Sequence, residues 1–134
     1  MTSSIVIDNS ALVVALTHVG SAGGAVRSRL HGVTSMNAPT LLDYELLSAL
    51  FGMERGRKIT DLQVEKALVS YKKLDVTCHQ TFDLRHRVRE LYSNLSSYAA
   101  QYVALAEALE LPLITCDARI ARSGAAKCAV EVFG

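Results

Sequence analysis

Residues 5–8 read Ile-Val-Ile-Asp, and residues 113–117 read Leu-Ile-Thr-Cys-Asp. Each is a short run of apolar or β-branched residues that ends at an aspartate, and a helix-like stretch follows each of them. The pattern predicts two strands that each carry an acid at the carboxyl end. In a parallel sheet both acids would emerge at the same edge, where open α/β folds bind their ligands.

The rest of the chain alternates between the two periodicities. Strands are also predicted at 33–36, 75–78 and 129–132, and helices at 11–17, 25–30, 41–55, 60–73, 81–92, 98–109 and 118–122. Gly20, Gly23 and Gly24 are expected to break the helical pattern before residue 25. Strands separated by helices predict an α/β fold, with a mostly parallel sheet that helices cover on both faces.

The length of 134 residues is usual for one domain, so we expect a single domain over residues 1–134. Half of the residues are hydrophobic and 20% are charged, a composition that supports a folded core and argues against disorder. The net charge is only +1. No global field therefore indicates a nucleic-acid partner, and any contact with RNA must be local.

Cysteine usage and the first residues indicate the compartment. Cys78, Cys116 and Cys128 are an odd number, with no C-x-x-C pair and no histidine at zinc-ligand spacing, so we expect reduced thiols in the cytoplasm. The start of the chain has no basic segment, and its apolar run ends at Asp8. The sequence predicts neither a signal peptide nor a membrane span, and hence a soluble protein without a membrane partner.

Asp8 and Asp117 suggest a metal site at the sheet edge. Mg²⁺ prefers oxygen ligands, and converging carboxylates would suit it or Mn²⁺. Taken singly, an aspartate after a strand is more often just the N-cap of the helix that follows, but one carboxylate can serve both roles. Glu45 lies within a predicted helix, where a single glutamate is more often a solvated charge than a ligand.

Three segments resemble the PIN-domain nucleases, and among them the VapC-type toxins of type II (VapBC) toxin–antitoxin systems. They are IVIDNSAL at 5–12, NAPTLLDYELLSAL at 37–50 and YAAQYVALAEALELPLITCD at 98–117. Each segment is weak evidence alone, but their order and spacing together are specific. The resemblance implies a three-layer α/β/α sandwich (PIN-like), Mg²⁺-dependent endonucleolytic cleavage of RNA, and four acids at the carboxyl edge of the sheet.

Three of these four acids have counterparts here, Asp8, Glu45 and Asp117, which are therefore the implied catalytic residues. The fourth acid of the family follows the tyrosine at the start of the 98–109 helix, and this chain has Ala99 there. The implied metal ligands are Asp8, the residue at 99 and Asp117, so one ligand is lost. Even indirect partners of metal ligands contribute about 10- to 100-fold to affinity or activity, so we expect the chain to be inactive or nearly so.

Ala99 has two explanations, a natural loss of activity and a deliberate replacement of an acid in a toxic enzyme. The other three acids remain, and so do the neighbouring Tyr98 and Tyr102. A long-inactive site would be expected to change at further positions as well. The intact surroundings therefore favour a deliberate change.

Residues close to the acids are candidates for supporting roles. Ser10 and Thr115 each lie two residues from an acid and could hydrogen-bond a carboxylate or a metal-bound water, or could simply be a cap and a sheet residue. Arg119 follows Asp117 closely and is the best candidate for a contact to an RNA phosphate. The implied chemistry is hydrolysis of a phosphodiester by water that a metal ion activates.

The resemblance also implies partners: an RNA substrate, a cognate VapB-type antitoxin that covers the acidic cleft, and a second copy in a homodimer. Two alternatives to a toxin remain open. One is a non-catalytic module that binds RNA or protein in the same cleft, and the other is a housekeeping nuclease of RNA processing without an antitoxin. Metal-independent RNA binding would favour the first, and growth arrest by a form with an acid at 99 would count against the second.

Overall fold

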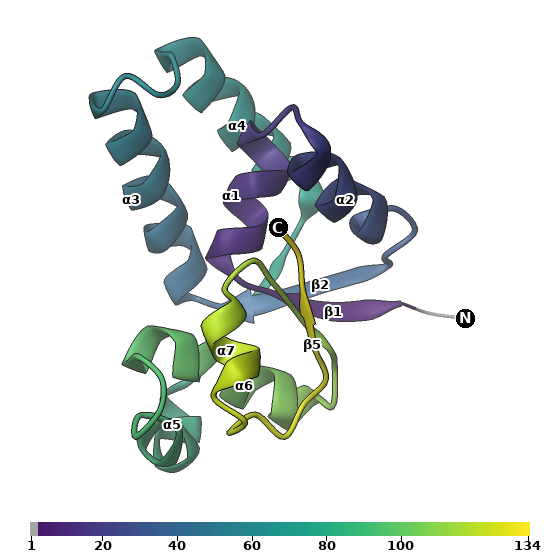
Figure 1. Ribbon diagram of the computed structural model, residues 1–134, viewed down its shortest axis with the longest axis vertical. Coiled ribbons are helices and arrows are strands. Elements are labelled where there is room, and N and C mark those ends of the chain that lie inside the picture. The colour runs from purple at the N-terminus through teal and green to yellow at the C-terminus, as the bar shows by residue number, and fades with distance from the viewer. Residues whose placement is uncertain (1–2) are drawn as a thin grey trace.

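The computed structural model describes residues 3–134, and its strands form one parallel sheet (Figure 1). The sheet order is β3-β2-β1-β4-β5, with bounds β1 (Ser4–Ile7), β2 (Ser35–Pro39), β3 (Thr77–His79), β4 (Leu113–Thr115) and β5 (Val130–Val132). β1 lies in the middle, where Val6 pairs with Asn37 of β2 and Leu113 of β4. The two strands that end in aspartates are therefore neighbours.

Helices cover the sheet on both faces. Figure 1 shows α1, α2, α3 and α4 on one side of the sheet and α5 and α6 on the other. The helices are α1 (Asn9–Thr17), α2 (Ser21–Leu30), α3 (Leu41–Arg55), α4 (Asp61–Leu74), α5 (Arg85–Leu91), α6 (Ser97–Leu109) and α7 (Ala118–Arg122), with a 3-10 turn η1 at Phe82–Leu84. The predicted three-layer α/β/α sandwich is confirmed, and within the described residues all of the strand pairings are parallel.

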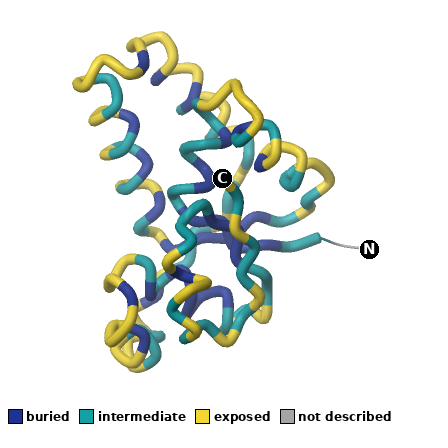
Figure 2. The backbone as a smooth tube through the Cα atoms, in the orientation of Figure 1, coloured by how far each residue is buried: buried dark blue, intermediate teal, exposed yellow. Residues whose placement is uncertain are grey.

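Burial explains why the central strands are apolar throughout. Ile5, Val6 and Ile7 have no exposed surface, and neither have Leu113 and Ile114 in the adjacent strand. A parallel strand that is covered on both faces needs a continuous apolar run rather than an alternating one. In Figure 2 the buried backbone is concentrated in these strands and on the inner sides of the helices.

The expectation that glycines interrupt the second helix is wrong, because α2 begins at Ser21 and runs through Gly23 and Gly24. Gly23 leaves room for the backbone that follows α1. A Cβ at this position would lie 2.1 Å from the carbonyl oxygen of His18, at the end of α1. Close packing between the two helices thus outweighs the low helix propensity of glycine.

Other predicted elements differ in their bounds, and the strand predicted at 75–78 is β3, Thr77–His79. The strand predicted at 33–36 begins at Ser35 and extends to Pro39, because its pairing partners are Ser4 to Val6 on one side and Thr77 to His79 on the other. The helix predicted at 81–92 is divided into η1 and α5. Within residues 3–134, none of the helices is long and apolar enough to cross a membrane.

Candidate active site at the carboxyl edge of the sheet

Asp8 occupies the junction between β1 and α1 and is buried, with 6% of its surface exposed. Its Oδ1 accepts hydrogen bonds from the backbone N–H of Ala11 at 3.0 Å and from the Ser10 hydroxyl at 2.7 Å. Its Oδ2 accepts a short hydrogen bond from the Thr115 hydroxyl. The carboxylate is thus the N-cap of α1 and is also held toward the neighbouring strand.

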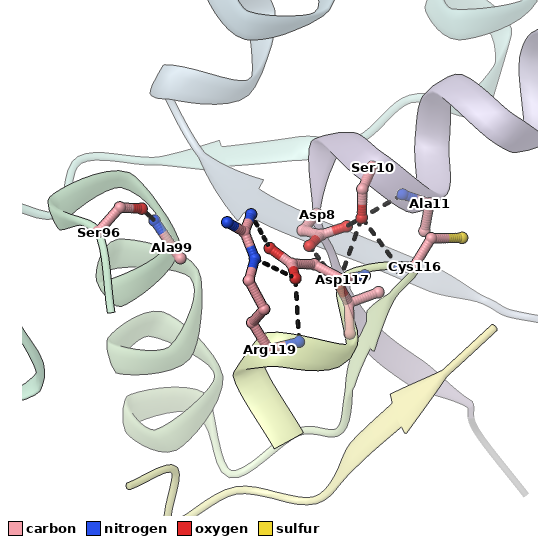
Figure 3. Close-up of polar contacts among 9 residues, drawn as sticks. Asp8, Ser10, Ala11, Ser96, Ala99, Cys116, Asp117 and Arg119 are labelled. Atoms are coloured by element: carbon pink, nitrogen blue, oxygen red, sulfur yellow. Dashed lines mark hydrogen bonds and ion pairs between the residues drawn. The ribbon is translucent and has the colours of Figure 1, made fainter. Parts of the chain in front are cut away.

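The two predicted supporting residues both contact Asp8 and link the ends of β1 and β4. Thr115 Oγ1 accepts from the backbone N–H of Asp117 at 2.9 Å, and Ser10 Oγ accepts from the N–H of Cys116 at 2.9 Å. Figure 3 shows Ser10, Asp8 and Asp117 in this network. The two hydroxyls orient the carboxylate of Asp8 and also accept hydrogen bonds from backbone N–H groups at the sheet edge. Ser10 and Thr115 therefore have structural roles in the cap and the sheet and also contact an acid of the candidate site.

Asp117 caps α7 and forms an ion pair with Arg119. Its Oδ1 accepts from the backbone N–H of Arg119 at 3.0 Å, and the guanidinium donates to both carboxylate oxygens at 2.9 Å. The Arg119 side chain is 78% exposed, so water screens the pair and another anion could compete for the guanidinium. Whether Arg119 contacts an RNA phosphate stays a prediction.

Ala99 faces the same space as this pair. A cavity of about 430 Å³ is lined by Ala99, Asp117 and Arg119 together with Ser96, whose hydroxyl accepts from the N–H of Ala99 at 3.0 Å. In Figure 3 the guanidinium of Arg119 lies between Ala99 and the carboxylate of Asp117. Position 99 thus lines the same cavity as Asp117, with no carboxylate of its own.

Glu45 approaches the acids from α3, and its partner is Tyr102, for which the sequence predicted no role. The hydroxyl of Tyr102 donates to Glu45 Oε1 at 2.6 Å, and Tyr102 is 3% exposed. Tyr102 stands three residues after Ala99 on α6, so the two share one helix face, and this spacing is the signal that could have identified it. A second cavity, of about 400 Å³, is lined by Glu45, Tyr98 and Asn9.

Asn9 is another residue of this region for which the sequence predicted no role. Among the described residues, its Oδ1 is the buried side-chain polar atom that lacks a hydrogen-bond partner. Nothing in the spacing of the sequence distinguishes Asn9 from an ordinary first residue of a helix. Asn9 also lines the second cavity beside Glu45.

The electrostatics of the three acids differ with their surroundings. Burial raises the pKa of Asp8 above its usual value, against the lowering effect of its hydrogen bonds, and the charge of Asp117 adds to the increase. Burial also raises the pKa of Glu45, with a smaller contribution from the charge of Asp8. The Arg119 guanidinium instead lowers the pKa of Asp117. The negative charges of Asp8 and Glu45 therefore lower the stability of the folded state.

This difference predicts how stability depends on pH. Because the pKa values of Asp8 and Glu45 are raised in the folded state, that state binds protons more tightly there than the unfolded chain does. In metal-free buffer, this contribution should raise Tm as the pH falls through the folded pKa values toward the ordinary values of 3.8 for Asp8 and 4.5 for Glu45. The ion pair of Asp117, with its lowered pKa, should be lost only at lower pH. Thermal melts between pH 7.5 and 4 with EDTA test this, and the Asp8→Asn variant should show a smaller rise.

A second expectation concerns Tyr102. In the Ala99→Asp background, Tyr102→Phe should lower kcat about tenfold with little change in KM, since the phenyl ring keeps the packing but releases Glu45. RNA cleavage kinetics measure the effect, and a melt of the same variant checks the fold. Tyr71→Phe is the control, because that hydroxyl binds Asp43 outside the site. An unchanged kcat in Tyr102→Phe would contradict the assigned role.

The residues that are present do not make a complete site for a divalent cation. Across residues 3–134, no three His, Cys, Asp or Glu side chains form a group that could hold a metal ion. Alanine at 99 supplies no ligand, and both oxygens of Asp117 already accept hydrogen bonds from Arg119. The metal site that the resemblance implies therefore stays a prediction, and Ala99 is one position where the residues present do not fit it.

An α/β/α sandwich with carboxylates at the carboxyl edge of a parallel sheet is the arrangement of the PIN-domain class. No protein-family model matches the chain. Curated relatives do: the chain is 36% identical over 129 residues to VapC ribonuclease Mb0985 of Mycobacterium bovis, covering 96% of this chain and 97% of that protein. It is 38% identical over 119 residues to ribonuclease VapC3 of Mycobacterium tuberculosis, covering 89% and 86%. The chain therefore belongs to the VapC ribonuclease family.

A solved structure supports the fold. The crystal structure of PAE2754 from Pyrobaculum aerophilum superimposes with a TM-score of 0.64 at 23% identity, over 98% of this chain and 92% of that one. A likeness at this level of identity concerns the architecture alone. The recognition of a VapC-type PIN domain from the sequence is confirmed by the relatives and by this architecture together.

Proposed function

We propose that this chain is the toxin component of a toxin–antitoxin system, built to cleave RNA phosphodiester bonds. The observation that carries the proposal is the convergence of Asp8 and Asp117 from adjacent strands, with Glu45 approaching from α3. The relatives named VapC ribonucleases support the same reaction. A VapB-type antitoxin and an RNA substrate are the partners that this assignment requires, and a homodimer is the expected assembly.

Ala99 is proposed to leave the chain inactive or nearly so. Mg²⁺, or Mn²⁺, is the proposed cofactor of the form that has an acid at 99, since the four acids would then offer only oxygen ligands. In the chain as it stands, Arg119 takes the place of a cation at Asp117 by donating to both of its oxygens. This pairing keeps the carboxylate charged without a metal ion.

The chain's own residues have separable tasks under this proposal. Ser10 and Thr115 hold the carboxylate of Asp8 in one orientation at the sheet edge. Glu45, whose pKa burial raises and whose orientation Tyr102 sets, is suited to hold a proton during hydrolysis. An antitoxin that inserts an arginine or lysine into this cluster would be bound by the same negative charge.

A second candidate function is a non-catalytic module that binds RNA in the same cleft. The observation in its favour is the ion pair between Asp117 and Arg119, which neutralises an acid of the site without a metal ion. A housekeeping nuclease is the weaker alternative, and no feature of the site favours it over a toxin.

The test is induced expression of this chain and of its Ala99→Asp variant in bacteria, followed by RNA cleavage by the purified proteins. The proposal predicts growth arrest and cleavage only with the variant, and relief by co-expression of a cognate antitoxin. Tight RNA binding by both proteins without cleavage by either would favour the binding module. Cleavage without growth arrest would favour the housekeeping nuclease.

A further inference from the structure

A surface cavity of about 570 Å³ lies beside the acids and has no role in the proposed function. Its principal lining residues come from four parts of the chain: Tyr44 at the start of α3, Gln80 to Phe82 before and within η1, Arg85 of α5 and Gln101 of α6. These elements meet near the end of α3 that lies toward α5 in Figure 1. We call the set Tyr44, Phe82, Arg85 and Gln101 the aromatic platform.

The rings of the platform are unusually exposed for their size. Tyr44 is 71% exposed and Phe82 is 75% exposed. The guanidinium of Arg85 lies over the Phe82 ring, 4.9 Å from its centroid, so the flat surface includes a cation. Two aromatic faces and a guanidinium plane are the groups on which proteins stack unpaired nucleobases.

Polar groups at the edge of the cavity match the edges of bases. The hydroxyl of Thr81 donates to Gln101 Oε1 at 2.8 Å. This bond uses the carbonyl oxygen of the amide and leaves its NH₂ group available as a donor. No carboxylate lines the cavity within the described residues. The nearest acid to Arg85 is Asp83, which is fully exposed to solvent and 4.0 Å from the guanidinium.

The platform is continuous with the candidate active site. Tyr44 lines this cavity and also the second cavity, which contains Glu45 and Tyr98. Tyr98 directly precedes Ala99 and is 56% exposed. Aromatic side chains therefore extend from the acids to Phe82, and a strand with its phosphate at the acids could place its neighbouring bases along them.

We propose that the aromatic platform binds unpaired bases of single-stranded RNA beside the cleavage position. This inference rests on the proposed function, because its ligand is RNA. Stacking selects strands whose bases are free and tolerates any sequence, since every base has a π-face. A duplex hides these faces and binds less tightly. The free NH₂ group of Gln101 and the guanidinium of Arg85 favour a nucleic acid, rather than an apolar protein surface, as the ligand.

The probe is a short single-stranded RNA that contains 2-aminopurine, titrated into this chain in EDTA, so that neither cleavage nor metal binding contributes. Binding should quench the 2-aminopurine fluorescence by stacking. Because stacking on one ring contributes about 1–3 kcal/mol per base, Phe82→Ala and Tyr44→Ala should each weaken binding about 5- to 150-fold and reduce the quenching. The Tyr44→Phe variant, which keeps a ring, should bind as the parent does.

The matched control is Phe51→Ala, which removes a 49% exposed ring of α3 that lines neither cavity and should leave binding unchanged. The inference is overturned if the chain binds no single-stranded RNA, if Phe82→Ala binds like Phe51→Ala, or if Phe82→Ala only converts a dimer to a monomer in sedimentation. Cleavage by Ala99→Asp reports on the proposed function separately. If Ala99→Asp cleaves RNA and the added Phe82→Ala change leaves its KM unchanged, the inference about the aromatic platform is wrong while the proposed function stands.

Discussion

Replacing Ala99 by aspartate is expected to raise the rate of Mg²⁺-dependent RNA cleavage by at least about 10- to 100-fold over this chain. Residue 99 is the third residue of α6, so a new carboxylate would lie in the first turn, where the positive end of the helix dipole favours an anion. It would share a cavity with Asp117 and could complete the incomplete set of acids. Cleavage of a labelled RNA mixture with Mg²⁺, with and without EDTA, measures the gain.

The matched control is Ala99→Asn, which has nearly the same volume as aspartate but no charge, and should gain little. EDTA should abolish the activity of Ala99→Asp. Binding of Mn²⁺ by the two variants, followed by calorimetry, separates metal affinity from catalysis. Equal cleavage by this chain and by Ala99→Asp would show that position 99 is not the missing acid of the site.

The second large effect is expected from Asp8→Asn in the Ala99→Asp background, with opposite consequences for activity and stability. Cleavage should fall at least about 10- to 100-fold, because a central carboxylate of the site is lost. Tm in metal-free buffer at pH 7 should rise, since burial raises the pKa of Asp8 and its charge opposes folding there. Asparagine keeps an oxygen that can accept from the Ala11 N–H, so the cap of α1 is retained.

Comparison with Asp117→Asn tests whether the buried charge of Asp8 causes the expected rise in Tm. It removes an acid of the same site, so cleavage should also be lost, but the pKa of Asp117 is lowered by Arg119 and its charge favours the folded state. Its Tm at pH 7 should therefore stay the same or fall slightly, as expected for an exposed pair. If Asp8→Asn melted below its parent at pH 7, the hydrogen bonds of the Asp8 carboxylate would outweigh the cost of burying its charge.

Much of the fold follows from local sequence alone. The apolar runs before Asp8 and Asp117 predicted two strands that are neighbours in the sheet, and the helical periodicity of Leu41 to Arg55 predicted α3 with the observed bounds. These predictions succeed because a strand that is buried on both faces and an amphipathic helix each need a characteristic spacing of apolar residues. The expectation about Gly23 failed because the close approach of His18 depends on how α1 packs on α2.

For the candidate site, the sequence by itself determined which acids end strands, and the resemblance implied an acid where Ala99 stands. It could not determine all of the residues that contact these acids, because some of those contacts join segments far apart in the chain. Only the tertiary structure decided that Thr115 binds Asp8 and that Tyr102 binds Glu45, 107 and 57 residues away along the chain. It also decided that Asp8 is buried while Asp117 is paired, and so separated the pKa values of two acids that look alike in the sequence. Charge and hydrogen bonding depend on burial and distance, which only the folded chain defines.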